Sequence, residues 1–174
     1  MSDAKTLFEM SDAGVAVCDR ARAVHLLLMA EKPFFNLVSI RSPGCGDHPV
    51  DRLSDRALSV LPLEFEDLDR EIPGRRCPPR LHHIAELVEW ANNKNEILIH
   101  CDAGCSRSSA CALVVLASRG TVEGAIEFLN PWLHWPNELI IELGARVVKQ
   151  PRLVEAVKKW KEWNKKNYPW FTGD

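Results

Sequence analysis

This sequence of 174 residues lacks long apolar runs, a secretory leader pattern and a strong excess of one charge. The longest apolar stretch, Ala23 to Ala30, is interrupted by His25 and is far too short to span a bilayer. Residues 1–10 hold no basic segment followed by an apolar core. A net charge of −2 does not suit a molecule that binds polyanions over its whole surface. We therefore expect a cytoplasmic protein with no membrane span and no nucleic-acid partner.

The six cysteines have neither the paired spacing of a disulfide framework nor that of a zinc site. Cys101, Cys105 and Cys111 form no CxxC pair, and Arg107 among them would repel a cation. The sequence therefore predicts reduced thiols, no metal and no cofactor. Cys105 or Cys77 could rescue an oxidised Cys101 as a disulfide, although thiols that simply fill space are the plainer interpretation.

Residues 100–108 read His-Cys-Asp-Ala-Gly-Cys-Ser-Arg-Ser and lie between two apolar runs. We interpret them as the end of a strand, a tight loop and the start of a helix. Gly104 lets the backbone turn tightly, and the loop amides and helix N-terminus face an anion. A thiol at the entrance, Cys101, and a guanidinium at the exit, Arg107, then describe a site for a tetrahedral oxyanion.

The thiol and the guanidinium together predict phosphoryl transfer. The loop amides, the helix dipole and Arg107 favour the thiolate of Cys101 and bind a dianionic phosphoryl group. The planar fork of Arg107 takes two phosphoryl oxygens at once. Attack of the Cys101 sulfur on phosphorus would give a cysteinyl-phosphate that water hydrolyses, with the hydroxyl of Ser108 behind the thiol.

A carboxylic acid is expected on a second loop, because the leaving group needs a proton and the attacking water must later lose one. The segment Leu63 to Asp69 is acidic. In an alternating strand Asp67 continues the inward-facing row, while Glu64 and Glu66 point away. Asp67 is therefore the candidate general acid and base, with Asp69 as the alternative. A solvated acidic loop without a catalytic role is the plain alternative to both.

The segment from His100 to Ser108 resembles the signature of the cysteine-dependent protein tyrosine phosphatases, in the variant of the small dual-specificity and bacterial tyrosine-phosphatase-like members. The resemblance covers roughly residues 14–120 in layout. It implies Cys101 as nucleophile, Arg107 as phosphate clamp, Ser108 as the hydroxyl that helps the thiolate leave, and Asp67 as the acid on a mobile loop. The implied phosphate-binding loop is Asp102, Ala103, Gly104, Cys105, Ser106 and Arg107.

Three functions stay open at this point. The leading one is a phosphatase acting on phosphotyrosine in a protein or peptide, with phosphoserine and phosphothreonine as further substrates. The same loop could serve inositol lipids or RNA 5′ ends, which basic loop residues would favour and Asp102 disfavours. The third is a pseudoenzyme that only binds phosphate, against which the intact Cys101, Asp67, Arg107 and Ser108 speak.

The alternation of strands and helices predicts an α/β fold in a single domain over residues 1–174. A central, mainly parallel sheet of about four to five strands would be flanked by helices, with the phosphate loop between a central strand and a helix. The expected strands are 14–18, 34–40, 58–63 and 97–100. The expected helices are 21–31, one opening at Pro79, 108–118, 122–129, one opening at Pro136 and running to about 148, and one from about 151. Residues 41–57 are expected to form a charged loop.

The remaining candidates are histidines and tryptophans. His100 either tunes Cys101 through a hydrogen bond or is a buried histidine satisfied by backbone. His82 and His83 are expected on the surface. Four residues could form a wall of the pocket: Trp132, His134, Trp135 and Asn137. The alternative is that they belong to the core.

A basic segment lies near the C-terminus. Residues 146–166 hold eight Lys or Arg against two Glu, a local charge of +6. With Trp160 and Trp163, this helix could contact an anionic partner such as lipid or nucleic acid. The favoured interpretation is an amphipathic helix that docks Leu153, Val157 and Trp160 on the domain while its lysines face water.

Overall fold

The computed structural model describes residues 10–46, 48–70 and 77–169, and over these residues its sheet has four strands, all parallel, in the order β1-β4-β2-β3. The strands are β1 (Val15–Asp19), β2 (Asn36–Arg41), β3 (Ser59–Glu64) and β4 (Ile97–Cys101). The predicted α/β fold with a parallel sheet is thus confirmed. Because β4 lies between β1 and β2, the segment after it emerges in the middle of the carboxyl edge, where parallel sheets bind ligands.

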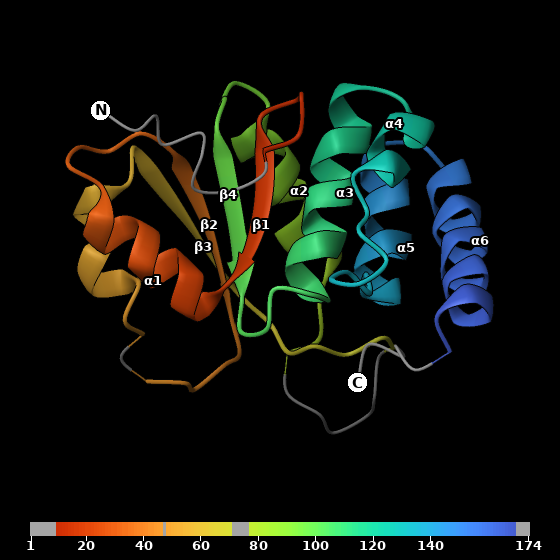
Figure 1. The fold of residues 1–174 in the computed structure, drawn as a ribbon, viewed down its shortest axis with the longest axis horizontal. Helices are drawn as coiled ribbons and strands as arrows, with labels where there is room; N and C mark the ends of the chain where they lie inside the picture. Colours follow the sequence, from red (N-terminus) through yellow and green to blue (C-terminus); the bar gives the residue numbers. More distant parts are fainter. Residues whose placement is uncertain (1–9, 47, 71–76, 170–174) are drawn as a thin grey trace.

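Helices cover both faces of this sheet (Figure 1). On one face lie α1 (Arg20–Met29) and the 3-10 helix η2 (Asp51–Arg56). The other face carries α2 (Leu81–Ala91), α3 (Arg107–Arg119), α4 (Val122–Glu127), α5 (Glu138–Val147) and α6 (Arg152–Asn167). The helix α3 lies against the sheet and α6 lies farthest from it (Figure 1).

The strand β4 and the helix α3 are the most deeply buried elements, and both lead into the segment between them. Every residue of β4 is buried: Ile97 and Ile99 face the larger core cluster, whereas Leu98 faces the smaller one under α1. The first eleven residues of α3 are buried as well. Many of them are Ser, Ala or Cys, whose small side chains let neighbouring helices approach closely. The segment 102–106 is therefore held at both ends by the core.

The connection from β2 to β3 differs from the sequence prediction. Residues 41–57 were expected to form a charged loop, but they include η2, and Val50 just before it is fully buried. Val50 and Leu53 pack into the smaller core cluster with α1. This apolar pair gives the segment a packed face, which the surrounding charges hide in the sequence.

The helix α6 is amphipathic, as the favoured interpretation predicted. Leu153 and Val157 are buried and Trp160 packs against the core. Lys161 is an exception to the expectation that the lysines face water, because its side chain is buried, its Nζ lies 3.0 Å from Glu138 Oε1, and it covers the ring of Trp135. No helix in the described part of the chain has the length and apolar content to cross a bilayer.

Candidate active site

The loop between β4 and α3 begins with a buried thiol. Cys101 is only 2 % exposed, and its sulfur accepts a hydrogen bond from the amide of Gly104 at 3.3 Å. Ser108 Oγ, in the first turn of α3, lies 3.2 Å from the same sulfur. The sulfur therefore contacts a backbone N–H and a hydroxyl at the start of a thirteen-residue helix.

The conformation of this loop depends on Gly104. Its φ is +76°, and an added Cβ would lie 2.6 Å from the backbone nitrogen of Asp19. Asp19 in turn caps α1 by accepting a hydrogen bond from the amide of Arg22. The loop thus packs directly on the junction between β1 and α1, so that only a residue without a side chain fits there.

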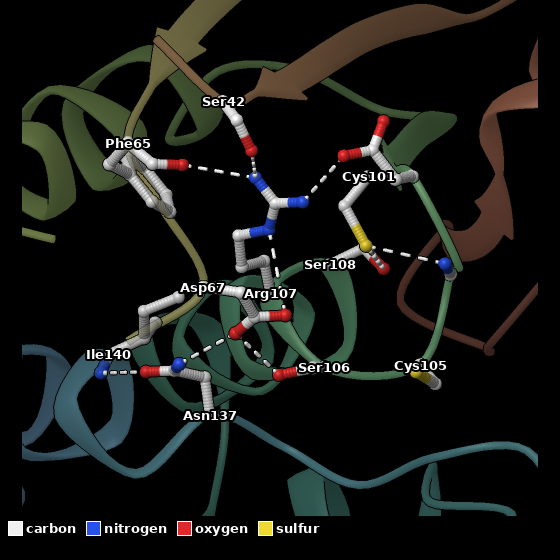
Figure 2. A network of polar contacts seen from close by, with 12 residues as sticks. Ser42, Phe65, Asp67, Cys101, Cys105, Ser106, Arg107, Ser108, Asn137 and Ile140 are labelled. Atoms are coloured by element: carbon white, nitrogen blue, oxygen red, sulfur yellow. Dashed lines mark hydrogen bonds and ion pairs between the residues drawn. The ribbon is translucent and has the colours of Figure 1, made fainter. Parts of the chain in front are cut away.

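Arg107 is the first residue of α3, and its guanidinium is held by three hydrogen bonds (Figure 2). Nη1 donates to Ser42 Oγ at 3.1 Å and to the carbonyl oxygen of Phe65 at 3.0 Å. Nη2 donates to Asp102 Oδ2 at 2.8 Å. Of its five N–H groups this leaves the one on Nε and one on Nη2, and Nε is buried without a hydrogen-bond partner among the described residues. These two N–H groups can form the side of the fork that binds two oxygens of a phosphoryl group.

The acidic loop after β3 places Asp67 beside this guanidinium. Oδ2 of Asp67 lies 3.6 Å from Arg107 Nε. Oδ1 accepts hydrogen bonds from Ser106 Oγ and from Asn137 Nδ2, both at 2.8 Å. Figure 2 shows Asp67, on the acidic loop, turned toward the segment that carries both Cys101 and Arg107.

The alternative candidate, Asp69, lies at a different place. Its Oδ1 accepts a hydrogen bond from the amide of Glu138, the first residue of α5. A carboxylate at a helix N-terminus satisfies an otherwise unpaired N–H and interacts favourably with the helix dipole. The structure therefore brings Asp67, and not Asp69, next to Arg107.

The strand alternation that singled out Asp67 holds only in part. Leu63 and Phe65 are buried as expected, but β3 ends at Glu64 and the side chain of Asp67 is 39 % exposed, so it faces the phosphate loop rather than the core. Glu64 is exposed, whereas Glu66 is half-buried and its Oε2 is buried. The period of two ends where the strand ends.

Asp102 and Cys105 make contacts that the motif alone does not reveal. The carboxylate of Asp102 lies between the side chains of Arg107 and Arg20, at 2.8 and 3.2 Å. The carbonyl oxygen of Cys105 accepts hydrogen bonds from the amide of Trp135 and from Ser109 Oγ. Burial raises the pKa of the Cys105 thiol, and it raises the pKa of Cys18 to about 12.

His100 is fully buried directly before the nucleophile candidate. Its Nδ1 donates to the carbonyl oxygen of Cys101 at 3.4 Å, and Ser39 Oγ lies 2.9 Å from its Nε2. Burial lowers the pKa of His100 to about 4, so the ring is neutral at neutral pH, and its Nε2 accepts a hydrogen bond from the Ser39 hydroxyl. The structure thus shows a buried histidine that is satisfied by a backbone carbonyl and by Ser39, and a role of His100 in tuning Cys101 stays a prediction.

The residues proposed as pocket walls divide into two groups. Trp135 and Asn137 adjoin the phosphate loop, because the amide of Trp135 donates to Cys105 and the side chain of Asn137 to Asp67. His134 is buried against Phe128, and Trp132 packs on Tyr168. The segment 131–137 therefore borders the loop only at its C-terminal end.

Three functional contacts were not found from the sequence. Ser42 and the carbonyl oxygen of Phe65 hold Arg107, and Arg20 pairs with Asp102. Ser42 follows β2 at the carboxyl edge of the sheet, so the general placement of ligand sites at that edge was the available signal. His83 also differs from its surface assignment: it accepts a hydrogen bond from the amide of Arg80 at the start of α2 and packs against Phe65.

The chain was compared with protein-family models, curated proteins and solved structures. No protein-family model matches the chain, and no curated protein does either. Among solved structures, DUSP15 is 17% identical over 87% of this chain and 95% of its own, with a TM-score of 0.50. The active form of Tk-PTP is 18% identical over 81% and 90%, with a TM-score of 0.47. The human tyrosine phosphatase-like serine/threonine/tyrosine-interacting protein is 14% identical over 86% and 91%, with a TM-score of 0.49.

The likeness to DUSP15 shows that this chain shares the fold of that protein, in line with what the resemblance of residues 100–108 implied about the fold.

Proposed function

We propose that this protein is a phosphomonoester hydrolase of the tyrosine or dual-specificity phosphatase type that works through a cysteinyl-phosphate intermediate. The observation that carries the proposal is the sulfur of Cys101 between the amide of Gly104 and the hydroxyl of Ser108, at the loop that leads to the buried guanidinium of Arg107. One short segment then supplies the nucleophile, the N–H groups that bind the phosphoryl oxygens, and the hydroxyl that helps the sulfur leave.

The first step is attack of the Cys101 thiolate on phosphorus. Two non-bridging oxygens are bound by Nε–H and Nη2–H of Arg107, and the amides of residues 102–106 hold the charge that develops on the phosphoryl group. The leaving oxygen takes its proton from Asp67. Because Oδ1 of Asp67 already accepts two hydrogen bonds, Oδ2 is the oxygen that carries this proton.

In the second step, water attacks phosphorus and the thiolate leaves. Asp67 Oδ2 takes a proton from the water, and Ser108 Oγ–H donates to the departing sulfur, from which it lies 3.2 Å away. The products are inorganic phosphate and the original thiolate. Every proton is accounted for by these side chains, so this route uses no metal and no cofactor.

The proposed substrate is a phosphorylated protein or peptide, in the cytoplasm. Asp102 supports this choice over inositol lipids and RNA 5′ ends, because its carboxylate lies beside the guanidinium that would bind the phosphoryl group and disfavours further negative charge there.

The test uses purified protein and a small aryl phosphate in the presence of a chelator. Wild type is expected to turn over and to be inhibited by vanadate, while Cys101→Ser binds vanadate without turnover. The matched control is Cys45→Ser, which changes an exposed free thiol in the β2–η2 connection and should behave as wild type. Turnover by Cys101→Ser, or labelled phosphate trapped on another side chain, would refute the mechanism.

The substrate class is tested separately with the same variant. Cys101→Ser protein, incubated with lysate, is expected to retain phosphopeptides. Retention of inositol phospholipids or of RNA in place of peptides would contradict the proposed substrate while leaving the chemistry intact.

A further inference from the structure

Asp102 is the one charged side chain of the loop between Cys101 and Arg107, and the proposed mechanism gives its charge no part. Its carboxylate bridges two arginines: Oδ2 lies 2.8 Å from Arg107 Nη2 and Oδ1 lies 3.2 Å from Arg20 Nη1. The two arginines differ in exposure, since the side chain of Arg107 is 5 % exposed and that of Arg20 is 44 % exposed. Asp102 is thus a carboxylate shared between a buried cation and a surface cation.

The contact with Arg107 involves the nitrogen that a phosphoryl group needs. Nη1 is fully occupied by Ser42 and the Phe65 carbonyl, so a phosphoryl group can bind only through Nε and Nη2. Asp102 already holds Nη2 at 2.8 Å, whereas Asp67 Oδ2 lies farther from Nε, at 3.6 Å. A phosphoryl dianion bound to Arg107 would therefore share Nη2 with the carboxylate of Asp102. The two negative charges would repel each other at this short distance.

Arg20 is the second cation that contacts the carboxylate of Asp102. It is the first residue of α1, and its amide also donates to the carbonyl oxygen of Asp102 at 3.3 Å, so backbone and side chain both hold the two residues together. When a phosphoryl group approaches Arg107, Asp102 still has a second cation, Arg20, at 3.2 Å, which attracts its carboxylate. Without Arg20 the carboxylate would depend on Arg107 alone.

We propose that Asp102 competes with the phosphoryl group for Arg107 and so lowers the affinity of the loop for dianionic esters and for product phosphate, while Arg20 limits this competition. The inference rests on the proposed phosphatase function and adds a residue that sets its affinity. It predicts that removing the charge of Asp102 tightens phosphate binding.

A different role for Asp102 gives the opposite result. If the carboxylate served only to hold the guanidinium in position, Asp102→Asn would keep an oxygen acceptor at the same place and leave binding unchanged or weaker. The sign of the effect on phosphate affinity therefore separates competition from positioning.

The experiment measures the dissociation constant of inorganic phosphate by calorimetry for wild type and four variants. Asp102→Asn is expected to bind about three- to tenfold more tightly than wild type at low salt, and the gain should shrink as salt screens the charges. Arg20→Gln is expected to bind more weakly than wild type, and to have a smaller effect when combined with Asp102→Asn. Glu123→Gln is the matched control, because it removes a carboxylate paired with Arg152 beyond the far end of α3 and should leave the constant unchanged.

Two results would overturn the proposal: phosphate binding by Asp102→Asn that is equal to or weaker than that of wild type, or an effect of Arg20→Gln in the opposite direction. Thermal unfolding of each variant is recorded alongside, and Arg20→Gln, at an exposed side chain, keeps the test valid if Asp102→Asn folds poorly. A different result would contradict the proposed function itself: phosphate binding that is the same in Arg107→Ala as in wild type.

Discussion

Asp67 and Asn137, seventy positions apart in the chain, are joined by a hydrogen bond of 2.8 Å from Asn137 Nδ2 to Asp67 Oδ1. The other end of the same amide caps α5, because Asn137 Oδ1 accepts from the amide of Ile140 at 3.0 Å. One side chain thus fixes the start of a helix and the place of a carboxylate on the acidic loop. Ser106 completes the link by donating to the same carboxylate oxygen from the phosphate loop.

The position of Asp67 predicts a large loss of rate when its carboxyl is replaced. Asp67→Asn is expected to lower kcat on an aryl phosphate by about 10² to 10⁴, the usual range for a lost proton donor. Asp69→Asn is the matched control: it weakens a contact with the amide of Glu138 and should change the thermal stability more than the rate. Steady-state kinetics checks both. A normal rate for Asp67→Asn together with a severe loss for Asp69→Asn would reverse the assignment.

The double role of Asn137 can be separated with two substitutions. Asn137→Ala removes the helix cap and the hydrogen bond to Asp67, so we expect a loss of about 1 kcal/mol in the free energy of unfolding and about a tenfold lower kcat. Asn137→Ser keeps a capping hydroxyl but is too short to reach Asp67, so only the rate should fall. Urea unfolding and steady-state kinetics with an aryl phosphate are the two measurements. Equal rates for Asn137→Ser and wild type would show that Asp67 does not need this contact.

The residues that the sequence singled out between 97 and 108 lie together in the structure because their signals are local. A strand, a tight turn and a helix start follow one another in residues 97–108, so their order in the chain is also their order in space. Asp67 was found through strand alternation, although that alternation ends before it. Asn137 was named only as a wall residue, and Arg20 was not named at all. Both contact the site through pairings of distant segments, for which a single sequence holds no periodic signal.

Ser108 is expected to act on the second step alone. Its hydroxyl lies 3.2 Å from the Cys101 sulfur, where it can stabilise the thiolate as the phosphoryl group departs. Ser108→Ala should therefore release the first alcohol or phenol in a rapid burst and then turn over slowly, with cysteinyl-phosphate accumulating. Stopped-flow kinetics with an aryl phosphate measures the burst. A slow turnover without a burst would instead place the loss in the first step.

The buried His100 predicts how stability depends on pH. Burial lowers its pKa to about 4, whereas an unfolded histidine has a pKa of about 6.5. The unfolded chain binds more protons between these values, so stability is full above pH 6.5 and falls as the pH drops towards 4. This residue alone should cost about 2 kcal/mol at pH 5.

The measurement is urea unfolding at pH 7 and pH 5. His100→Asn removes the titrating ring and lowers stability at both pH values, because it also loses the contacts with Ser39 and Cys101. The difference between the two pH values should nevertheless shrink by about 2 kcal/mol relative to wild type. A difference that stays the same would mean that His100 is not the group that becomes charged on unfolding.

A pair of glycines separates backbone strain from steric exclusion at the phosphate loop. Gly104 and Gly44 have nearly the same conformation, with φ of +76° and +75°. An added Cβ would meet Asp19 at 2.6 Å from Gly104, but nothing within 4 Å of Gly44. Gly44→Ala should therefore cost only the strain of a left-handed alanine, about 1 kcal/mol, and leave activity unchanged.

Gly104→Ala adds a collision with the backbone at the β1–α1 junction, so the loop must move and phosphate binding should be lost. Calorimetry with phosphate and thermal unfolding give the two readouts. Phosphate binding retained by Gly104→Ala would mean that the loop can hold an oxyanion without lying against Asp19.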